Sequence, residues 1–418
     1  MPAALIVGAF GQDNPGDEAL LASSIAAVQA QPGWDPVVVT SRPDETAELH
    51  QVEALDASAT VAASGAVRAD ALVVGGGTVF KELHGSTGRA PGALLRRATA
   101  LAGIFHARRR PVALIGVGAA PIDHPGNRRL ARALAHRSDL LVLRDAESAH
   151  VLTGMGVTGP LRVGADLAWI AGAGRSEEEL TGLTGPPTPD ASLAGAADGD
   201  GADRVIDLRT PERAHPDAPR PAGPLASEAP LGVAVSHLAG DDAFLDRLAA
   251  ALRGVARSGV PVELEPWQGS PRLGPDAVVA HRLQRHIGDG AVVVPPPDDL
   301  GEATERMARR CAVVAMRFHA TVAAAEAGTP FVAVTHEPKL EALARRAEQP
   351  TIGLSDGRGE MAASIYDAVL GAPPSPEMVV LERQRARATI DLLGLVLTGA
   401  GQPRGLSHLD LVPEPTPA

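Results

Sequence analysis

Short apolar runs that alternate with helical patterns constrain the fold of this chain more than any other feature. In the first half, runs typical of buried strands lie at residues 4–8, 36–40, 71–74, 111–116 and 140–144. Helical patterns lie at residues 17–30, 94–107, 128–138 and 148–153. Strands that alternate with helices at this length predict βαβ units and a mostly parallel sheet.

The same alternation resumes in the second half of the chain. Expected strands lie at residues 232–236, 261–265, 291–294, 311–315 and 331–334, and expected helices at 242–258, 300–310, 320–327 and 376–397. A chain of 418 residues exceeds one ordinary hydrophobic core. We therefore predict an α/β protein with two Rossmann-like domains, residues 1–171 and 231–398, that face each other across a cleft.

Two segments lack core-forming periodicity. Residues 172–230 are rich in Gly, Pro and Ala, and we expect a disordered linker or insertion there. Residues 399–418 are expected to form a flexible tail.

Composition limits the function classes. The net charge of −12 opposes binding to a phosphate backbone, and ten aromatic residues (3 Trp, 1 Tyr, 6 Phe) offer few platforms for base stacking. The single cysteine, Cys311, permits no disulfide within the chain. The 13 His lack metal-ligand spacing, and no Walker A sequence is present. We expect no nucleic-acid partner, no metal and no cofactor.

The chain also lacks the usual marks of export or membrane insertion. Residues 1–8 have no basic region, and no apolar run approaches the roughly 20 residues that span a bilayer. We expect a cytoplasmic protein without a transmembrane segment. Basic clusters such as residues 108–110 leave peripheral membrane contact open.

Polar side chains follow two successive strands of the second half. Arg317 and His319 come directly after the strand at 311–315, and Glu337 and Lys339 follow the next one. In open parallel sheets the ligand crevice lies outside these carboxyl ends. A fixed cation, an imidazole, a carboxylate and an ammonium together suit chemistry on a small anion. Each residue alone is more often a packing or surface residue, but two polar clusters at successive strand ends strengthen the hypothesis of a functional site.

Glycine-rich turns occupy the corresponding places in the first half. Residues 8–18, between the first strand and helix, include Asn14, Gly16 and Asp17, but their glycine spacing is not the dinucleotide fingerprint. Asp17 serves equally well as a helix N-cap. Gly76 and Gly77 follow the strand at 71–74, where they let the backbone approach a polar ligand. Arg144 ends a further strand and is expected to face the cleft.

Taken in order, these segments resemble the polysaccharide pyruvyl transferase family. The resemblance is carried by residues 11–18, 75–77, Arg144-Asp145 with Ser148, 165–166, 316–319 and 337–339. It implies a GT-B-like fold and transfer of the enolpyruvyl unit of phosphoenolpyruvate onto a sugar of a cell-envelope polysaccharide or its precursor. The product is a pyruvate ketal, and phosphate is released. Two departures are Glu337 where members commonly carry Asp, and the long segment 172–230.

The resemblance implies that Arg144, Arg317 and His319 lie at the phosphoenolpyruvate site. His319 is the expected general acid and base, because an imidazole titrates near neutral pH. Arg317 and Arg144 suit a carboxylate or phosphate, and Lys339 suits the departing phosphate. Asp17 and Glu337 are expected to hold or deprotonate sugar hydroxyls.

Two other functions stay open. A GT-B-type glycosyltransferase that uses a sugar nucleotide needs a nucleobase pocket in the second domain, and no convincing sequence for one is present. A non-catalytic relative that binds a glycan has no need of the His319 imidazole. The acceptor sugar, a lipid link on that acceptor and the oligomeric state are not determined by the sequence.

Overall fold

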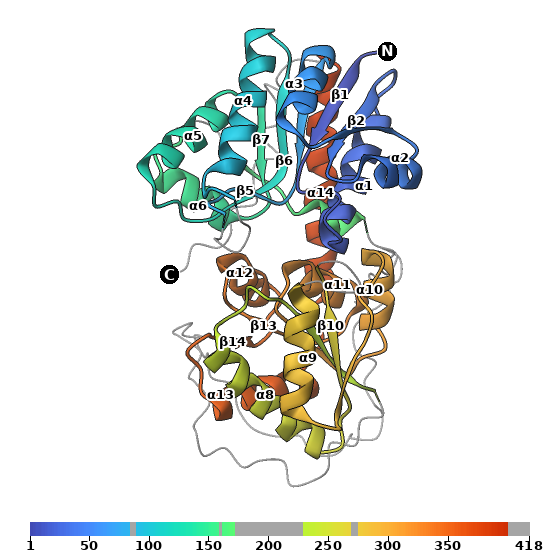
Figure 1. Cartoon of the computed structure of the whole chain (residues 1–418), viewed down its shortest axis with the longest axis vertical. Helices are drawn as coiled ribbons and strands as arrows, with labels where there is room; N and C mark the ends of the chain where they lie inside the picture. Colours follow the sequence, from blue (N-terminus) through green and yellow to red (C-terminus); the bar gives the residue numbers. More distant parts are fainter. Residues whose placement is uncertain (84–88, 159–160, 172–228, 269–274, 400–418) are drawn as a thin grey trace, which may run out of the picture.

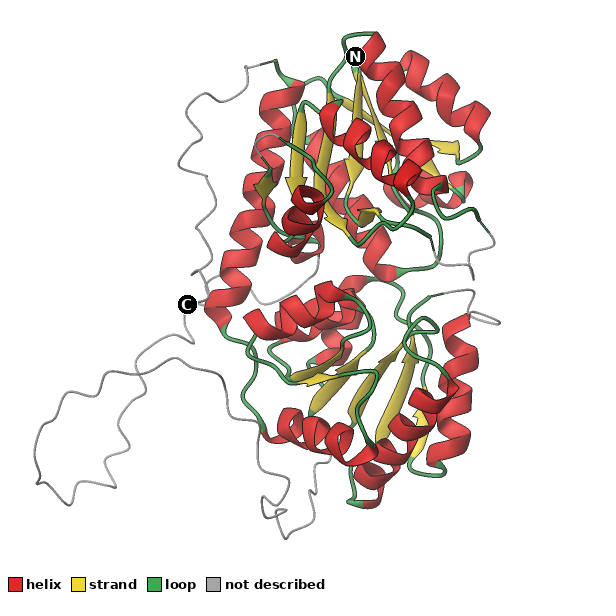
Figure 2. Ribbon diagram, turned by 90° about the vertical axis from the view of Figure 1, so that its left-hand side faces the viewer, coloured by secondary structure: helices red, strands yellow, loops and turns green. Residues whose placement is uncertain are grey.

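The computed structural model describes residues 1–83, 89–158, 161–171, 229–268 and 275–399. Nearly all of the expected linker 172–230 and of the tail 399–418 therefore lies outside the described residues. Two α/β domains are stacked along the long axis of the molecule (Figure 1). The view turned by 90° shows a sheet flanked by helices in each domain (Figure 2).

The N-terminal sheet has the order β3-β2-β1-β4-β6-β7-β8, and β5 pairs with β6. Its strands are β1 (Ala3–Val7), β2 (Asp35–Thr40), β3 (Glu53–Asp56), β4 (Ala71–Gly75), β5 (Thr78–Phe80), β6 (Val112–Ala119), β7 (Leu140–Leu143) and β8 (Arg162–Val163). The pairings are parallel, as in β1 with β2 and with β4. Strand order reverses between β1 and β4, which is where open α/β sheets bind ligands.

Helices connect the strands of this domain. They are α1 (Pro15–Gln29), α2 (Pro43–His50), α3 (Ala59–Arg68), α4 (Ala93–Ala107), α5 (Pro125–His136), α6 (Ala146–Gly154) and the 3-10 helix η2 (Leu167–Ile170). Several begin as the sequence chemistry requires: α1 has Asn14 as its N-cap and Pro15 at its first position, and Asp145 caps α6.

The C-terminal sheet has the order β11-β10-β9-β12-β13-β14. This is the 3-2-1-4-5-6 strand order of the Rossmann fold. Its strands are β9 (Leu231–Val235), β10 (Val262–Pro266), β11 (Ala291–Val293), β12 (Ala312–Ala315), β13 (Phe331–Val334) and β14 (Thr351–Ile352). Its helices are α8 (Asp242–Arg257), α9 (Pro275–Ile287), α10 (Leu300–Met307), α11 (Phe318–Ala327), α12 (Pro338–Arg346) and α13 (Arg358–Leu370). The reversal here lies between β9 and β12.

The helix α14 (Pro376–Leu397) returns to the N-terminal domain. We expected it inside a C-terminal unit, but it packs against η2, β6, β7 and α1 (Figure 1). Its first turns still contact the other domain, because Arg383 pairs with Glu326 of α11. The apolar periodicity predicted the helix correctly, but periodicity does not say which sheet a helix covers.

One hydrophobic core runs through both domains. It joins residues of α1 and η2, such as Leu20 and Trp169, to residues of α10 and α11, such as Met307 and Val322. Two further clusters each lie within a single domain. The shared core holds the two walls of the cleft against each other.

The predicted fold class is confirmed: both halves are parallel α/β sheets. Several elements were not predicted from the sequence, including β3 and the helices α2, α3, α9, α12 and α13. The strand β3 has no fully buried residue, so it lacks the apolar run that identified the others. Within the described residues no helix is both long and apolar enough to cross a membrane.

Candidate active site

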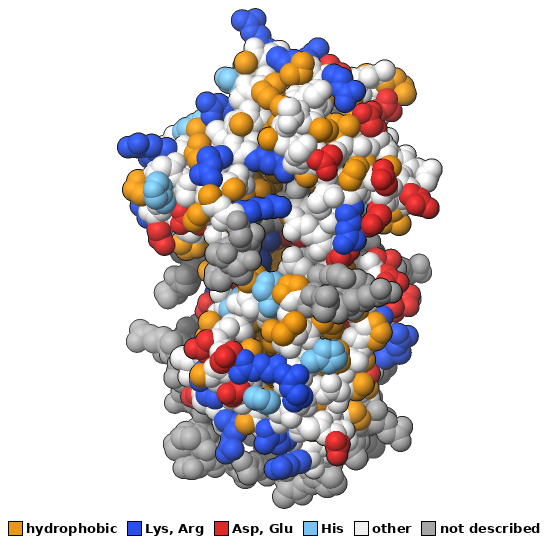
Figure 3. Space-filling model, in the orientation of Figure 1, with side chains coloured by type: hydrophobic (Ala, Val, Ile, Leu, Met, Phe, Trp, Pro, Cys, Tyr) orange, Lys and Arg blue, Asp and Glu red, His pale blue; other side chains and the backbone are white. Residues whose placement is uncertain are grey.

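A cleft of about 600 Å³ lies at the carboxyl ends of both sheets. From the N-terminal domain it is lined by the β1–α1 turn, the turn after β4 and Arg144; from the other domain, by His237, 316–319 and 336–339. Figure 3 shows the waist between the domains, with Lys and Arg side chains on the upper domain next to it. The cleft therefore joins the switch points of the two sheets.

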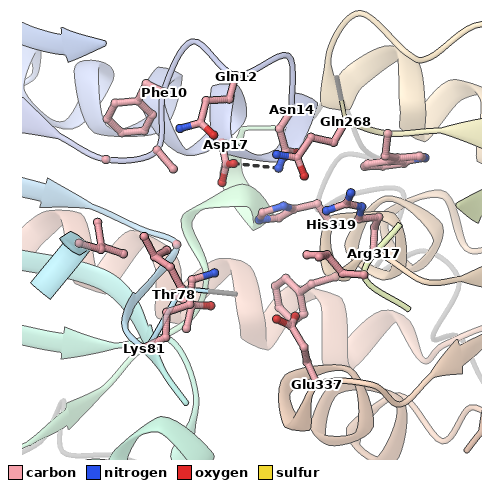
Figure 4. A pocket seen from close by; sticks show the side chains of 18 of the residues that line it. Phe10, Gln12, Asn14, Asp17, Thr78, Lys81, Gln268, Arg317, His319 and Glu337 are labelled. Atoms are coloured by element: carbon pink, nitrogen blue, oxygen red, sulfur yellow. Dashed lines mark hydrogen bonds between the residues drawn. The ribbon is translucent and has the colours of Figure 1, made fainter. Parts of the chain in front are cut away.

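The first turn of α1 forms one wall of the cleft. The Asn14 side chain accepts a hydrogen bond from the Gly16 backbone at 3.1 Å and donates one to Asp17 Oδ2 at 2.8 Å (Figure 4). Asn14 is thus the N-cap, and the alternative reading of Asp17 as the cap is wrong. Burial raises the pKa of Asp17, although His319 and nearby lysines partly oppose the shift. A carboxyl group with a raised pKa suits proton exchange with a hydroxyl.

Arg144 lies deep at the base of the cleft. It donates to Asp145 at 3.0 Å, to Thr78 at 3.0 Å and to Asp166 at 3.5 Å. Its guanidinium carbon also lies 4.8 Å from the centre of the Phe318 ring. Two carboxylates therefore already balance its charge, and it connects three N-terminal segments to the C-terminal domain.

His319 lies between the two domains. Its Nε2 atom is 3.7 Å from Oδ1 of the buried Asp166, which is an ion-pair distance but too long for a hydrogen bond. Burial favours the neutral form of Asp166, yet His319 and Arg144 hold the pKa of Asp166 below its usual value. The ring also lies against α1: a Cβ atom at Gly16 would be 1.8 Å from Nδ1 of His319. Only glycine at position 16 lets the imidazole approach Asp17.

Arg317 is held by its own domain. Its Nη2 atom lies 2.6 Å from Oδ2 and 2.7 Å from Oδ1 of Asp276, at the start of α9. Asp276 is fully buried and also accepts from the His237 backbone at 2.8 Å and contacts His237 Nδ1 at 2.6 Å. Among the described residues the hydrogen bonds of the Arg317 side chain use Nε and Nη2, so the Nη1 edge of the guanidinium remains for a ligand of the cleft. Arg317 is less free to hold an anion than its sequence position indicated.

Glu337 and Lys339 form a close pair at the start of α12. Lys339 Nζ lies 2.5 Å from Glu337 Oε2 and 5.8 Å from the centre of the Phe318 ring. Burial opposes ionisation of Glu337, but the Lys339 ammonium lowers the pKa of Glu337 to about 2. Burial lowers the pKa of Lys339, and Glu337 opposes that shift. Glu337 is therefore ionised near neutral pH, and the pair is partly open to the cleft.

The charge of the cleft is the reverse of that of the whole chain. Its carboxylates are Asp17 and Glu337. Its basic side chains are Lys81, Arg89, Arg97, Arg144, Arg317 and Lys339. Arg144, Arg317 and Lys339 each pair with a carboxylate, whereas Lys81 makes no ion pair within 4.0 Å among the described residues. The cleft thus presents positive charge to a ligand.

Most of the predicted site residues line this one cleft. They are Asn14, Asp17, Gly77, Arg144, Arg317, His319, Glu337 and Lys339. Gly16 and Gly76 do not line it, contrary to our expectation. Gly16 makes room for His319, and Gly76, at φ +70°, packs against Leu20 where a Cβ would lie 2.8 Å from that side chain. Both glycines support the walls through backbone packing.

Several residues that line the cleft were not predicted from the sequence. His237 directly follows the end of β9, so the rule that identified Arg317 would have found it. Lys81 follows the glycine-rich turn after β4 at the end of β5, which was not expected as a strand. Figure 4 shows Lys81 and Thr78 on the wall opposite Arg317. Burial lowers the pKa of a third lining histidine, His336.

In the described part of the chain, no group of three or more His, Cys, Asp or Glu side chains has the arrangement of a metal site. The histidines of the cleft contact carboxylates or backbone instead, as in His336 Nδ1 at 3.1 Å from the Val334 carbonyl.

The family model for polysaccharide pyruvyl transferases matches residues 14–338, which include both walls of the cleft. The chain belongs to the polysaccharide pyruvyl transferase family. The match starts at Asn14 and ends at Pro338, so it includes the segments that carried the sequence resemblance except residues 11–13 and 339. Among curated protein sequences, none matches the chain.

Solved structures share the fold of this family member at low sequence identity. UDP-GlcNAc 2-epimerase from Neisseria meningitidis, bound to UDP-GlcNAc, is 12% identical with a TM-score of 0.57, and the match covers 94% of this chain and 99% of that one. An Anabaena protein in complex with UDP and glucose is 13% identical (TM-score 0.55, 96% and 98% covered). A glycosyltransferase from Rickettsia africae is 9% identical (TM-score 0.53, 96% of each chain). These likenesses confirm the GT-B-like architecture.

Proposed function

We propose that this protein transfers the enolpyruvyl unit of phosphoenolpyruvate onto two hydroxyls of a sugar in a cell-envelope glycan or its precursor. The observation that carries the proposal is the cleft at the two switch points, where His319 lies among basic side chains in a chain of the pyruvyl transferase family. Phosphoenolpyruvate is a small trianion at most, and a cationic, partly enclosed cleft suits it.

The reaction needs two proton movements. The methylene carbon of phosphoenolpyruvate gains a proton, and the first sugar hydroxyl adds to the neighbouring carbon and loses its proton. The second hydroxyl then adds to the same carbon while the carbon–oxygen bond to phosphate breaks, and its proton leaves with phosphate. The products are a methyl ketal and inorganic phosphate, so atoms and charge balance.

The side chains of the cleft divide these tasks between them. His319 is our candidate to deliver the proton to the methylene carbon, because an imidazole exchanges protons near neutral pH. Asp17 lies close enough to His319 for the imidazole to affect its pKa, and a carboxyl with a raised pKa suits deprotonation of a hydroxyl.

The anionic groups of phosphoenolpyruvate need cations. Lys81 of the N-terminal domain and Lys339 of the C-terminal domain both line the cleft and lower the pKa of Asp17, so both lie near the proton-transfer groups. We assign phosphate to these two lysines and the carboxylate to the Nη1 edge of Arg317. Arg144 then acts mainly through Asp166, which it holds beside His319.

The test is direct. Purified protein is incubated with phosphoenolpyruvate and a panel of envelope-glycan precursors, and both phosphate release and the mass of the adduct are measured. A pyruvyl adduct that appears in step with phosphate supports the proposal. Release of uridine or guanosine diphosphate from sugar nucleotides, without phosphoenolpyruvate, would identify a glycosyltransferase instead. Glycan binding without turnover would identify a non-catalytic relative.

A further inference from the structure

A second cationic position lies on the N-terminal wall of the cleft, at Arg97 on the second turn of α4. The side chain is partly buried, and its Nε and Nη2 atoms are shielded from solvent without a hydrogen-bond partner. A shielded guanidinium without a partner loses hydration and gains nothing in exchange. The mechanism proposed above makes no use of it.

Other buried or largely buried arginines of the described chain are paired. Each has a carboxylate partner: Arg144 with Asp145, Arg310 with Glu265, Arg317 with Asp276 and Arg383 with Glu326. Arg97 has no such ion pair within 4.0 Å in the described chain. The fold therefore leaves one cleft-lining guanidinium for an anion from outside.

The charges around Arg97 favour the binding of an anion. Arg89 also lines the cleft, and its charge adds to burial, the larger effect, in lowering the pKa of Arg97. Asp56 attracts Arg97 but forms no ion pair with it and does not line the cleft. Two neighbouring guanidiniums suit a phosphate group, which carries about 1.5 to 2 negative charges at neutral pH.

Arg97 is separate from the proton-transfer groups. The charged side chains with the largest effects on the pKa of Asp17 are His319, Lys81, Lys339 and Arg317, and Arg97 is not among them. The N-terminal part of the cleft lining also includes residues after β2 and β3 and Leu83, Ala93 and Leu94, with hydroxyls from Thr40 and Ser41. His319 and Lys339 come from the C-terminal domain. A phosphate group bound at Arg97 therefore lies outside the position assigned to phosphoenolpyruvate above.

We propose that Arg97, together with Arg89, binds a phosphate group of the glycan acceptor. The acceptor is then a phosphate-linked precursor, such as a lipid-linked or nucleotide-linked sugar, and not a neutral finished polysaccharide. The inference rests on the proposed function for its biological meaning, but the anion site itself is measurable without turnover.

The binding test uses inorganic diphosphate and the full-length protein in isothermal titration. We expect Arg97→Gln to weaken diphosphate binding by at least about 10-fold, because it removes a charge-assisted bidentate contact. Arg96→Gln is the matched control: Arg96 is its exposed neighbour on the same helix and does not line the cleft. It should change the dissociation constant less than about 2-fold. Lys339→Gln removes the diphosphate binding that occurs at the phosphoenolpyruvate site. The diphosphate binding that depends on Arg97 should remain in this variant.

Stability separates a binding role from a structural one. Arg97 has no ion-pair partner among the described residues, so Arg97→Gln breaks no ion pair there. The melting temperature of this variant should therefore equal or exceed that of the wild type. The proposal is overturned by any of four results: no diphosphate binding, equal loss in Arg96→Gln, unchanged binding in Arg97→Gln, or a lower melting temperature that accounts for the lost binding. Diphosphate binding that depends on Arg97, in a protein that transfers no pyruvyl group, would reject the proposed function and retain the anion site.

A competition experiment distinguishes the sources of the phosphate. With an active acceptor, diphosphate should inhibit competitively against the acceptor and not against phosphoenolpyruvate. Arg97→Gln should raise KM for phosphate-linked acceptors by about 10-fold or more and leave KM for phosphoenolpyruvate unchanged. The Arg97→Gln variant is also compared on a lipid-linked acceptor and on its water-soluble phosphate analogue. Loss of affinity for both would show that phosphate, not lipid, is recognised. Equal use of neutral and phosphate-linked acceptors would overturn the proposal.

Discussion

Two of the three histidines that line the cleft each face a buried aspartate, but the two pairs are built differently. His237 contacts Asp276 at 2.6 Å within one domain, and Arg317 completes a closed cluster. His319 lies 3.7 Å from Asp166 of the other domain, and its Nε2 has no hydrogen-bond partner in the described chain. A tight pair fixes structure, whereas a loose pair across a domain boundary leaves an imidazole available for proton transfer.

The sharpest test of this comparison is to remove each imidazole. His319→Ala should lower the rate of phosphate release from phosphoenolpyruvate by about 10²- to 10⁴-fold, the usual contribution of a general acid or base. His237→Ala should lower it by less than about 10-fold, because its ring mainly supports Asp276. Equal losses in both variants, with folded protein confirmed by circular dichroism, would contradict the assignment.

Removing the two carboxylates should reverse the order of effects on stability. Asp276→Ala leaves the largely buried Arg317 without its partner, which costs about 3 kcal/mol in the free energy of unfolding, the lower end of the range for a fully buried pair. Asp166→Ala leaves Arg144 with Asp145, so we expect a smaller loss of about 1 to 3 kcal/mol. Urea denaturation measures both. A larger loss for Asp166→Ala would show that the loose pair carries more of the structure than its distance indicates.

The position of the His319 ring is tested through the glycine it touches. Gly16→Ala would bring a Cβ to 1.8 Å from Nδ1, so the ring must shift, and we expect a loss of about 100-fold in turnover. Gly103→Ala is the control, because no atom lies within 4 Å of its Cβ position in α4. Activity should be unchanged there, and stability should rise by up to about 1 kcal/mol. Turnover in Gly16→Ala equal to that of the wild type would show that the ring position does not matter.

The smallest expected effect concerns pH and the Glu337–Lys339 pair. Because the folded pKa of Glu337 is about 2, below its usual 4.5, ionised Glu337 stabilises the folded state above pH 4.5, and this contribution is lost as pH falls toward 2. Glu337→Gln should lack that component, so its urea midpoint should change less than that of the wild type between pH 4.5 and 2. Parallel curves for the two proteins would refute the role of the pair.

The sequence predicted the parts of the site that depend on local order. Arg317, His319, Glu337 and Lys339 each lie directly after a strand, and the alternation of strands and helices made their convergence predictable. The partners of these residues could not be predicted. Asp276 reaches Arg317 through packing of α9, an unexpected helix, and nothing in the sequence says which aspartate faces which histidine.

The fold could likewise be predicted where it depends on local sequence patterns, and not where it depends on packing between distant segments. Apolar runs identified the central strands, whose side chains are buried on both faces. The half-exposed strand β3 and the short polar helices lack that signal. The unpaired guanidinium of Arg97 is visible only once three dimensions show which carboxylates are absent around it.

The return of α14 has a consequence for how the protein is made. During synthesis the N-terminal sheet leaves the ribosome long before the helix that covers part of it, so that surface stays bare while the second domain is translated. Domains otherwise tend to fold as units in order of synthesis. Here the first domain is complete only after α14, at the far end of the described chain, has been made. A nascent chain that pauses before residue 376 therefore exposes apolar surface to a chaperone.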